Sequence, residues 1–382
     1  MPILSSEETR DFLKRGFSRR NFGRIATMLT AGATLPFYNE PALAQLSRVK
    51  GTIPPDAVLI NANENPMGPC PEAAEAMRNM VQKGGRYMYA LTDELAQTLA
   101  QVEGVKPDYV RPFAGSSAPL HQAVLAYCSP QKSYVCGDPG YEAGGRAAEF
   151  IGAKAINVPL TKDYAHDVKA MAAADSNAGL IYLCNPNNPT GTLTSREDME
   201  WLLANKPAGS ILMVDEAYIH IADGASSMVD LAAKDKEIII LRTFSKLYGM
   251  AGLRAGAAIG RPDLLKKIMP YSAGALPVTA MIGATTSLKV KTLVAERRKI
   301  IRDIREDTLS FLDQQRVHYV PSVSNKFMMD VKRPGREFIA LMEKEKVYVG
   351  RVWPSWPTYV RVTVGSRDDM AKFKAAYLKV TA

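Results

Sequence analysis

Residues 179–191 read GLIYLCNPNNPTG, an apolar run followed by a turn rich in asparagine and proline. Asn-Pro pairs after a short apolar run are typical of a strand that ends in a turn. Similar apolar runs, with helical patterns between most of them, recur at 134–136, 155–158, 211–214, 237–241 and 255–259. Because these strands are hydrophobic nearly throughout, we expect an α/β fold in which helices cover both faces of a mostly parallel sheet.

The segments outside this sheet predict further units. Residues 279–320 show the pattern of one or two long amphipathic helices, and shorter strand and helix patterns alternate beyond Pro321. The expected organisation is a leader at 1–44, an amino-terminal arm at 45–70, a large domain at 71–278, a connecting helix at 279–320 and a small α+β domain at 321–382.

The leader has the features of an export signal. Ser18-Arg-Arg-Asn-Phe-Gly-Arg24 contains a twin-arginine pair with an aromatic residue two places after it. An apolar run at 25–35 and the small-residue motif Ala42-Leu-Ala44 follow in order. We therefore expect export to the periplasm through the twin-arginine route, transient membrane contact only, and cleavage after Ala44. The alternative is a basic amphipathic helix at the start of a cytoplasmic protein.

Composition excludes several classes of partner. The formal net charge of +9 invites a nucleic-acid interpretation. However, acidic residues lie among the basic ones in stretches such as 296–299 and 302–306, and no basic stripe with interleaved aromatics occurs, so we expect no nucleic-acid partner. The four cysteines lack zinc-site or CxxC spacing, and the four histidines do not cluster with acids or cysteines. We therefore expect no metal centre.

Polar residues that can carry chemistry follow three of the predicted strands. They are Asn188, Asp215, Tyr218, Ser245, Lys246 and Arg254. The carboxyl ends of strands in an open α/β sheet border one crevice, so these side chains can converge there. Each alone has an ordinary interpretation, such as a turn aspartate or a surface lysine. Together they suit pyridoxal 5'-phosphate (PLP).

Each residue type meets a need of that cofactor. A lysine amine can form an imine with the PLP aldehyde and can move a proton. An aspartate can pair with the pyridine nitrogen, and an asparagine and a tyrosine can donate hydrogen bonds to the phenolate oxygen. A serine, an arginine and the amides of a helix start, here offered by Gly115-Ser-Ser117, can hold the phosphate.

On these motifs the chain resembles the fold type I PLP-dependent aminotransferases of class I/II. Within them it is most similar to histidinol-phosphate aminotransferases and their aromatic-amino-acid relatives, from about Leu59 to the C-terminus. The segment Asn61-Ala-Asn-Glu-Asn-Pro66 matches the start of that subgroup.

The resemblance implies further site residues. It implies cofactor contacts by Ser116, Ser117 and Tyr141, a cofactor contact across a homodimer by Tyr87, and substrate contacts by Asn65, Arg351 and Arg361. Trp353 and Trp356, beside Arg351, either line a pocket for a flat side chain, pack in the core or brace a loop.

The expected function is transamination of an amino acid or related amine with a 2-oxo acid, in a ping-pong sequence. Decarboxylation or elimination on the same fold is the first alternative, and a non-catalytic amino-acid-binding protein is the second. Because histidine biosynthesis is cytoplasmic, export predicts a substrate other than histidinol phosphate.

Overall fold

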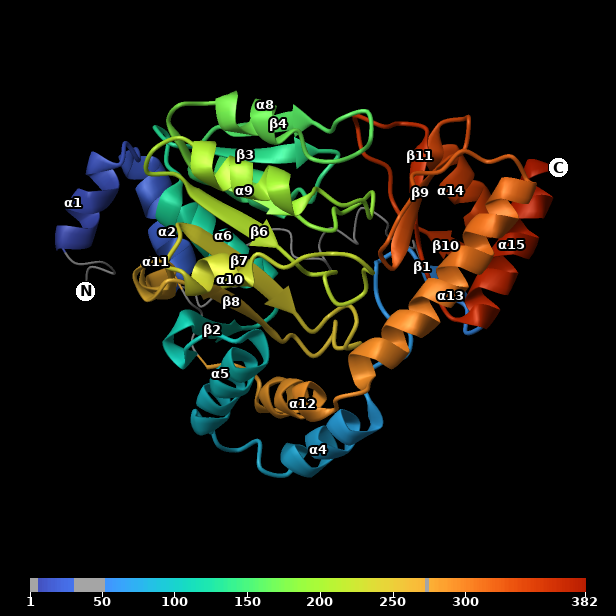
Figure 1. The fold of residues 1–382 in the computed structure, drawn as a ribbon, viewed down its shortest axis with the longest axis horizontal. Coiled ribbons are helices and arrows are strands. Elements are labelled where there is room, and N and C mark those ends of the chain that lie inside the picture. The colour runs from blue at the N-terminus through green and yellow to red at the C-terminus, as the bar shows by residue number, and fades with distance from the viewer. Residues whose placement is uncertain (1–5, 31–51, 272–274) are drawn as a thin grey trace.

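The computed structural model describes residues 6–30, 52–271 and 275–382 and has a seven-stranded sheet at its centre (Figure 1). The strand order is β2-β8-β7-β6-β5-β3-β4, in which β8 pairs antiparallel with both β2 and β7 and all other pairs are parallel. The strands are β2 (Val110–Phe113), β3 (Ser133–Asp138), β4 (Ala155–Pro159), β5 (Ala178–Cys184), β6 (Ile211–Asp215), β7 (Ile238–Thr243) and β8 (Gly256–Gly260). The predicted α/β class with a mostly parallel sheet is therefore confirmed.

Alternate side chains of the central strands enter two different cores. In β6, Met213 belongs to one apolar cluster and Leu212 and Val214 to the other, and both clusters are buried. Helices α6 (Ser117–Tyr127), α7 (Ala143–Ile151) and α11 (Pro262–Ile268) cover the first face. Helices α5 (Ala90–Glu103), α8 (Val168–Ala173), α9 (Arg196–Asn205) and α10 (Val229–Ala233) cover the second. Burial on both faces explains why these strands are apolar throughout.

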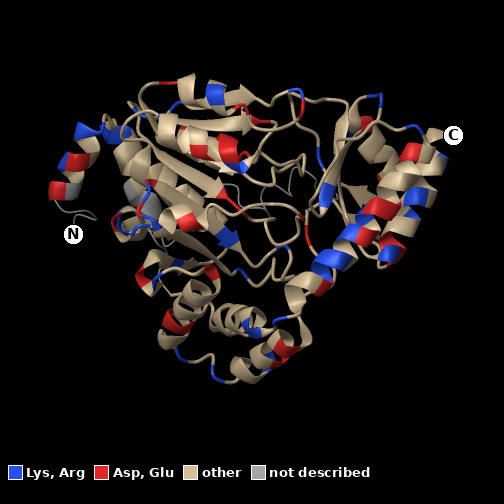
Figure 2. Ribbon diagram, in the orientation of Figure 1, with Lys and Arg blue, Asp and Glu red and all other residues tan. Residues whose placement is uncertain are grey.

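The predicted connecting segment forms two helices with different roles. Helix α12 (Val278–Lys289) packs against α4 (Pro71–Val81) and α5, whereas α13 (Leu293–Gln314) runs on to the small domain (Figure 1). Basic and acidic residues alternate along α13, where Lys299 pairs with Asp303 (Figure 2). Because acidic residues alternate with the basic ones, α13 has no basic stripe although the chain as a whole is basic.

The small domain includes part of the predicted arm. Strand β1 (Val58–Ile60) pairs in parallel with β10 (Val347–Val349), and β9 (Lys326–Asp330) pairs antiparallel with β11 (Tyr359–Thr363). Helices α14 (Gly335–Lys344) and α15 (Arg367–Thr381) pack beside them. The chain between β1 and α4 therefore passes from the small domain to the large one.

The amino-terminal helices pack on the large domain rather than standing apart from the fold. Helices α1 (Ser6–Lys14) and α2 (Arg19–Thr30) bury Phe12, Phe17 and Ile25. Arg15 donates hydrogen bonds to the carbonyls of 125, 126 and 128, where α6 ends, and such carbonyls favour a cation. The predicted cleavage site after Ala44 lies outside the described residues. Within the described residues, no helix has the length and apolar character that crossing a membrane requires.

Candidate active site

Lys246 is buried between the sheet and the arm. It follows β7 directly, and its Nζ donates a hydrogen bond of 2.9 Å to the backbone carbonyl of Asn63. The side chain of Asn63 donates to the hydroxyl of Tyr218 at 2.5 Å. Asn63 has a φ of 59°, in the left-handed region that asparagine tolerates better than most residues. The arm therefore joins the predicted lysine to the predicted tyrosine, and sequence reasoning did not single out Asn63.

Asp215 is held at the carboxyl end of β6. Its Oδ2 accepts a hydrogen bond of 2.8 Å from the hydroxyl of Tyr182 in β5, and its Oδ1 accepts one of 3.1 Å from the amide of Ala217. Burial, together with the nearby Asp215 charge, raises the pKa of Tyr182 well above its ordinary value, so Tyr182 stays a donor. Sequence reasoning missed Tyr182, although a tyrosine in an otherwise aliphatic strand was a usable signal.

A cationic, amide-rich cradle lies at the start of α6. Arg254 donates to the hydroxyl of Ser245 at 3.5 Å and to the carbonyl of Ala114 at 3.3 Å. Gly115 has a φ of 86°, and a Cβ there would collide with the Arg254 guanidinium. Ser116 is the N-cap of α6. A helix start combined with a guanidinium is a favourable site for a phosphate dianion.

Tyr141 extends this arrangement toward the small domain. Its hydroxyl lies 3.2 Å from the hydroxyl of Ser117, the first residue of α6. The predicted cofactor residues of one subunit thus lie at or after the ends of β3, β5, β6 and β7, just before β8, and at the start of α6. They are Ser116, Ser117, Tyr141, Asn188, Asp215, Tyr218, Ser245, Lys246 and Arg254.

Arg361 reaches this site from β11 of the small domain. Its guanidinium donates to the side-chain oxygen of Asn188 at 2.9 Å and to the backbone carbonyl of Asn61 at 2.9 Å. The residue is buried, and it links the small domain, the turn after β5 and the arm. A planar guanidinium in this position can bind a carboxylate through two parallel hydrogen bonds.

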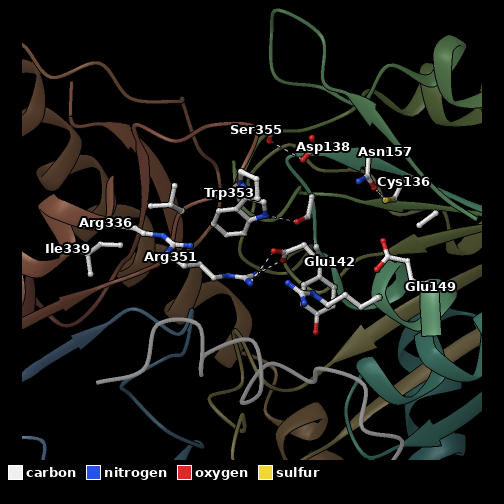
Figure 3. Close-up of a pocket in the computed structure, with 18 of the residues that line it drawn as sticks. Cys136, Asp138, Glu142, Glu149, Asn157, Arg336, Ile339, Arg351, Trp353 and Ser355 are labelled. Carbon is white, nitrogen blue, oxygen red and sulfur yellow. Dashed lines mark hydrogen bonds and ion pairs between the residues drawn. The ribbon is translucent and has the colours of Figure 1, made fainter. Parts of the chain in front are cut away.

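Arg351 lies on the same side but already has an acidic partner. Its guanidinium makes two hydrogen bonds, of 2.5 and 3.2 Å, to the carboxylate of Glu142, the N-cap residue of α7 (Figure 3). The ring of Trp353 lies 4.5 Å from the guanidinium carbon. Trp353 is 1% exposed, donates to the carbonyl of Gly140 and packs in a small apolar cluster, and it also lines the cavity beside this ion pair.

A cavity of about 770 Å³ opens beside this ion pair, between the edge of the large domain and the small domain. Figure 3 shows acidic groups of Asp138, Glu142 and Glu149 and basic groups of Arg336 and Arg351 along its lining, to which Glu343 and Arg146 also belong. Glu142 was not among the predicted site residues, because only the fold brings it to Arg351.

The surroundings of Asn65 differ from those expected, and Tyr87 lies outside the site of its own subunit. Asn65 donates its side-chain amide to the backbone carbonyls of Lys246 and Leu247, at 3.0 and 2.9 Å. It therefore braces the lysine loop instead of presenting its amide to a substrate. Tyr87 is 71% exposed, in the loop between α4 and α5 at the bottom of Figure 1, apart from the carboxyl ends of the central strands.

The four cysteines are buried and form no disulfide. Burial raises the pKa of Cys136 to about 12, which keeps its thiol protonated and unreactive. Among the described residues, no group of three or more His, Cys, Asp or Glu side chains is placed to hold a metal ion.

The chain belongs to the family of class I and II aminotransferases, which matches residues 55–376. It is a PLP-dependent aminotransferase. Over 337 residues it is 30% identical to a histidinol-phosphate aminotransferase of Moorella thermoacetica, covering 86% of each chain. Over 329 residues it is 32% identical to an aromatic amino acid aminotransferase of Nocardia farcinica, covering 84% of this chain and 90% of that one.

A solved structure shows the same fold. The crystal structure of histidinol-phosphate aminotransferase from Sinorhizobium meliloti in complex with pyridoxal-5'-phosphate has a TM-score of 0.81 to this chain at 24% sequence identity, and covers 92% of this chain and 96% of that one.

The residues of this structure fit the cofactor. The cradle at Gly115, Ser116 and Arg254 suits its phosphate, and the buried Asp215 carboxylate suits its pyridine nitrogen. Asn63 Oδ1 is a buried acceptor that has no hydrogen-bond donor among the described residues. Bound PLP supplies an electron sink for a carbanion at the substrate α-carbon.

Proposed function

We propose that the enzyme transaminates an amino acid that has a free α-carboxylate and an uncharged side chain. The observation that carries this proposal is the doubly hydrogen-bonded pair between the buried Arg351 and the partly buried Glu142. Arg361 can bind the α-carboxylate, whereas the second guanidinium is already neutralised from within the protein.

The pair acts on substrate choice through charge. An anionic side chain such as a phosphate or carboxylate would have to displace Glu142, which would leave a partly buried carboxylate beside the incoming anion. Like charges and lost charge-assisted hydrogen bonds both oppose this exchange. A neutral side chain meets no such penalty. The likeness to an aromatic amino acid aminotransferase agrees with this choice.

Glu142→Gln is expected to change this selectivity. Freeing Arg351 should raise kcat/KM for acidic amino acids by about 10- to 100-fold, the value of one charge-assisted hydrogen bond or two. The rate with aromatic amino acids should change little. The measurement is a screen of these donors against 2-oxo acids with the purified, PLP-loaded enzyme.

Glu149→Gln is the matched control, because Glu149 lines the same cavity on α7 without an ion pair to Arg351. It should leave the order of donors unchanged. A wild-type enzyme that already prefers acidic donors, with no further change in Glu142→Gln, would contradict the proposal.

We further propose the roles of the remaining groups. Lys246 carries the cofactor and moves the proton from the α-carbon, Asp215 holds the pyridine nitrogen, and Asn188 and Tyr218 contact the phenolate oxygen. The phosphate takes hydrogen bonds from the α6 start, Ser245 and Arg254. These roles are supported by the hydrogen bonds that position each group.

We also propose a homodimer, in which Tyr87 contacts the cofactor of the partner subunit. Its exposure, and the distance of the loop between α4 and α5 from the strand ends in Figure 1, support a role toward a second copy.

Finally, we propose export through the twin-arginine route. Ser18, Arg19 and Arg20 are exposed at the start of α2, while Phe17 is buried and Phe22 partly buried, so the arginine pair is accessible on the folded protein. Replacing both arginines with lysine should abolish accumulation of the full chain in the periplasm of a host with this route. Arg10→Lys is the control, and equal export of the double variant would contradict the proposal.

A further inference from the structure

A second buried lysine lies beside the catalytic tyrosine. Lys326 is the first residue of β9, is 0% exposed, and has its Nζ 3.1 Å from the centre of the Tyr218 ring. The same Nζ donates to the hydroxyl of Ser324 at 2.9 Å. Lys246 Nζ lies 5.9 Å from the same ring centre. One tyrosine ring is thus close to both amines.

The free-energy cost of burying the Lys326 ammonium argues against a purely structural role for this residue. Lysine is almost never fully buried, since removing an ammonium from water is expensive. The next residues of the strand, Phe327, Met328 and Met329, are apolar and fully buried, so packing here does not require a charge. The face of an aromatic ring does attract a cation, and the hydroxyl of Ser324 provides an oxygen acceptor.

We infer that Lys326 is a positioning residue for the reaction: its ammonium, held on the face of Tyr218, lowers the proton affinity of the phenol and of the cofactor-linked Lys246 nitrogen. This inference rests on the proposed attachment of the cofactor to Lys246. A nearby cation favours the phenolate over the phenol and a neutral nitrogen over a protonated one. Both effects have the same sign, so removing the cation should raise both pKa values.

Other charged and titratable groups also act on this site, and all remain in the variants. Asp215 and Lys246 approach from the large domain, Arg361 from β11, and Cys184 from the end of β5. Burial raises the pKa of Cys184, the Asp215 charge adds to that rise, and the Lys326 ammonium opposes it. Removing the Lys326 charge is therefore expected to shift the midpoint of the cofactor titration without abolishing that titration.

The test is a pH titration of the absorbance of the PLP-loaded full chain. In Lys326→Met, which keeps the length of the side chain without its charge, the midpoint of the cofactor band should rise by about 1 pH unit. In Lys326→Arg the midpoint should stay near the wild-type value. Lys206→Met is the matched control, because Lys206 is a mostly buried lysine paired with Glu237, outside the site. It should not shift.

Two further measurements separate the possible failures. Borohydride reduction followed by peptide mass analysis locates the cofactor: attachment at another lysine contradicts the proposed role of Lys246 itself. If Lys326→Met does not load cofactor, Ser324→Ala is the variant that tests the inference. Loss of the hydroxyl acceptor destabilises the protonated form of Lys326, so the midpoint of the cofactor band should rise by a smaller amount. The inference is overturned if the cofactor is on Lys246 and the midpoint is unchanged in a PLP-loaded Lys326→Met protein. If Lys326→Met does not load PLP, an unchanged midpoint in Ser324→Ala overturns it.

Discussion

Lys246→Ala is expected to slow transamination by at least about 10³-fold, because one side chain supplies both the nucleophilic amine and the proton transfer. The protein should still fold, since the change leaves the Asn63 carbonyl without one hydrogen bond but removes no large apolar contact. Single-turnover measurements with an aromatic amino acid, together with circular dichroism, would test both statements. Added methylamine should restore part of the rate.

Lys206→Ala serves as the control for this variant, because it also removes a mostly buried amine but lies outside the site. It should keep nearly the full rate. Turnover by Lys246→Ala within tenfold of an active wild type would contradict the assignment. If the wild type and Lys246→Ala were equally inactive, the non-catalytic amino-acid-binding alternative would be favoured.

Arg242→Met is expected to have the largest effect on stability. Arg242 lies in β7, four residues before Lys246, and its guanidinium is buried between the carboxylates of Glu103 and Glu216. Removing one member of a buried ion cluster costs about 3–5 kcal/mol, since the remaining carboxylates stay buried without their counter-ion. Urea unfolding of the cofactor-free protein should show this loss in the free energy of unfolding.

The dependence of the free energy of unfolding on pH, on the acid side, provides a second test of this ion cluster. Burial alone would raise the pKa of Glu103, but the charge of Arg242 and hydrogen bonds with it lower the net value below the ordinary one. A carboxylate with a lowered folded pKa stabilises the protein above its unfolded pKa, and this stability is lost as pH falls through the folded pKa. Arg242→Met should remove that part of the acid dependence. Lys299→Met, which breaks the exposed pair with Asp303, should change little.

The sheet was predictable because its signal is local. The apolar runs that became β5, β6 and β7 end within about two residues of the expected positions, and burial on both faces is the reason they were apolar. The residues at their carboxyl ends, such as Asp215 and Lys246, follow from the same pattern. Parallel strands place their ends together, so convergence of the predicted cofactor residues required no further information.

The rest of the site depends on contacts between distant segments. Glu142 meets Arg351 across 209 positions and Asn63 meets Tyr218 across 155, and neither pairing has a local signal. Lys326 resembled any lysine at the start of a strand until the fold buried it. The burial of Phe12 and Phe17 in the amino-terminal segment was likewise not predictable, because these side chains pack on a surface that only the folded large domain provides.

The hydrogen bonds of Arg361 bear on how tightly substrates bind. Its guanidinium already donates to Asn188 and to the backbone of Asn61. An arriving carboxylate must therefore compete with these acceptors, and the net gain in ground-state affinity is small. Weak ground-state binding leaves more of the interaction energy for the step in which charge develops, so the enzyme should work with a high Michaelis constant and release its oxo-acid product quickly.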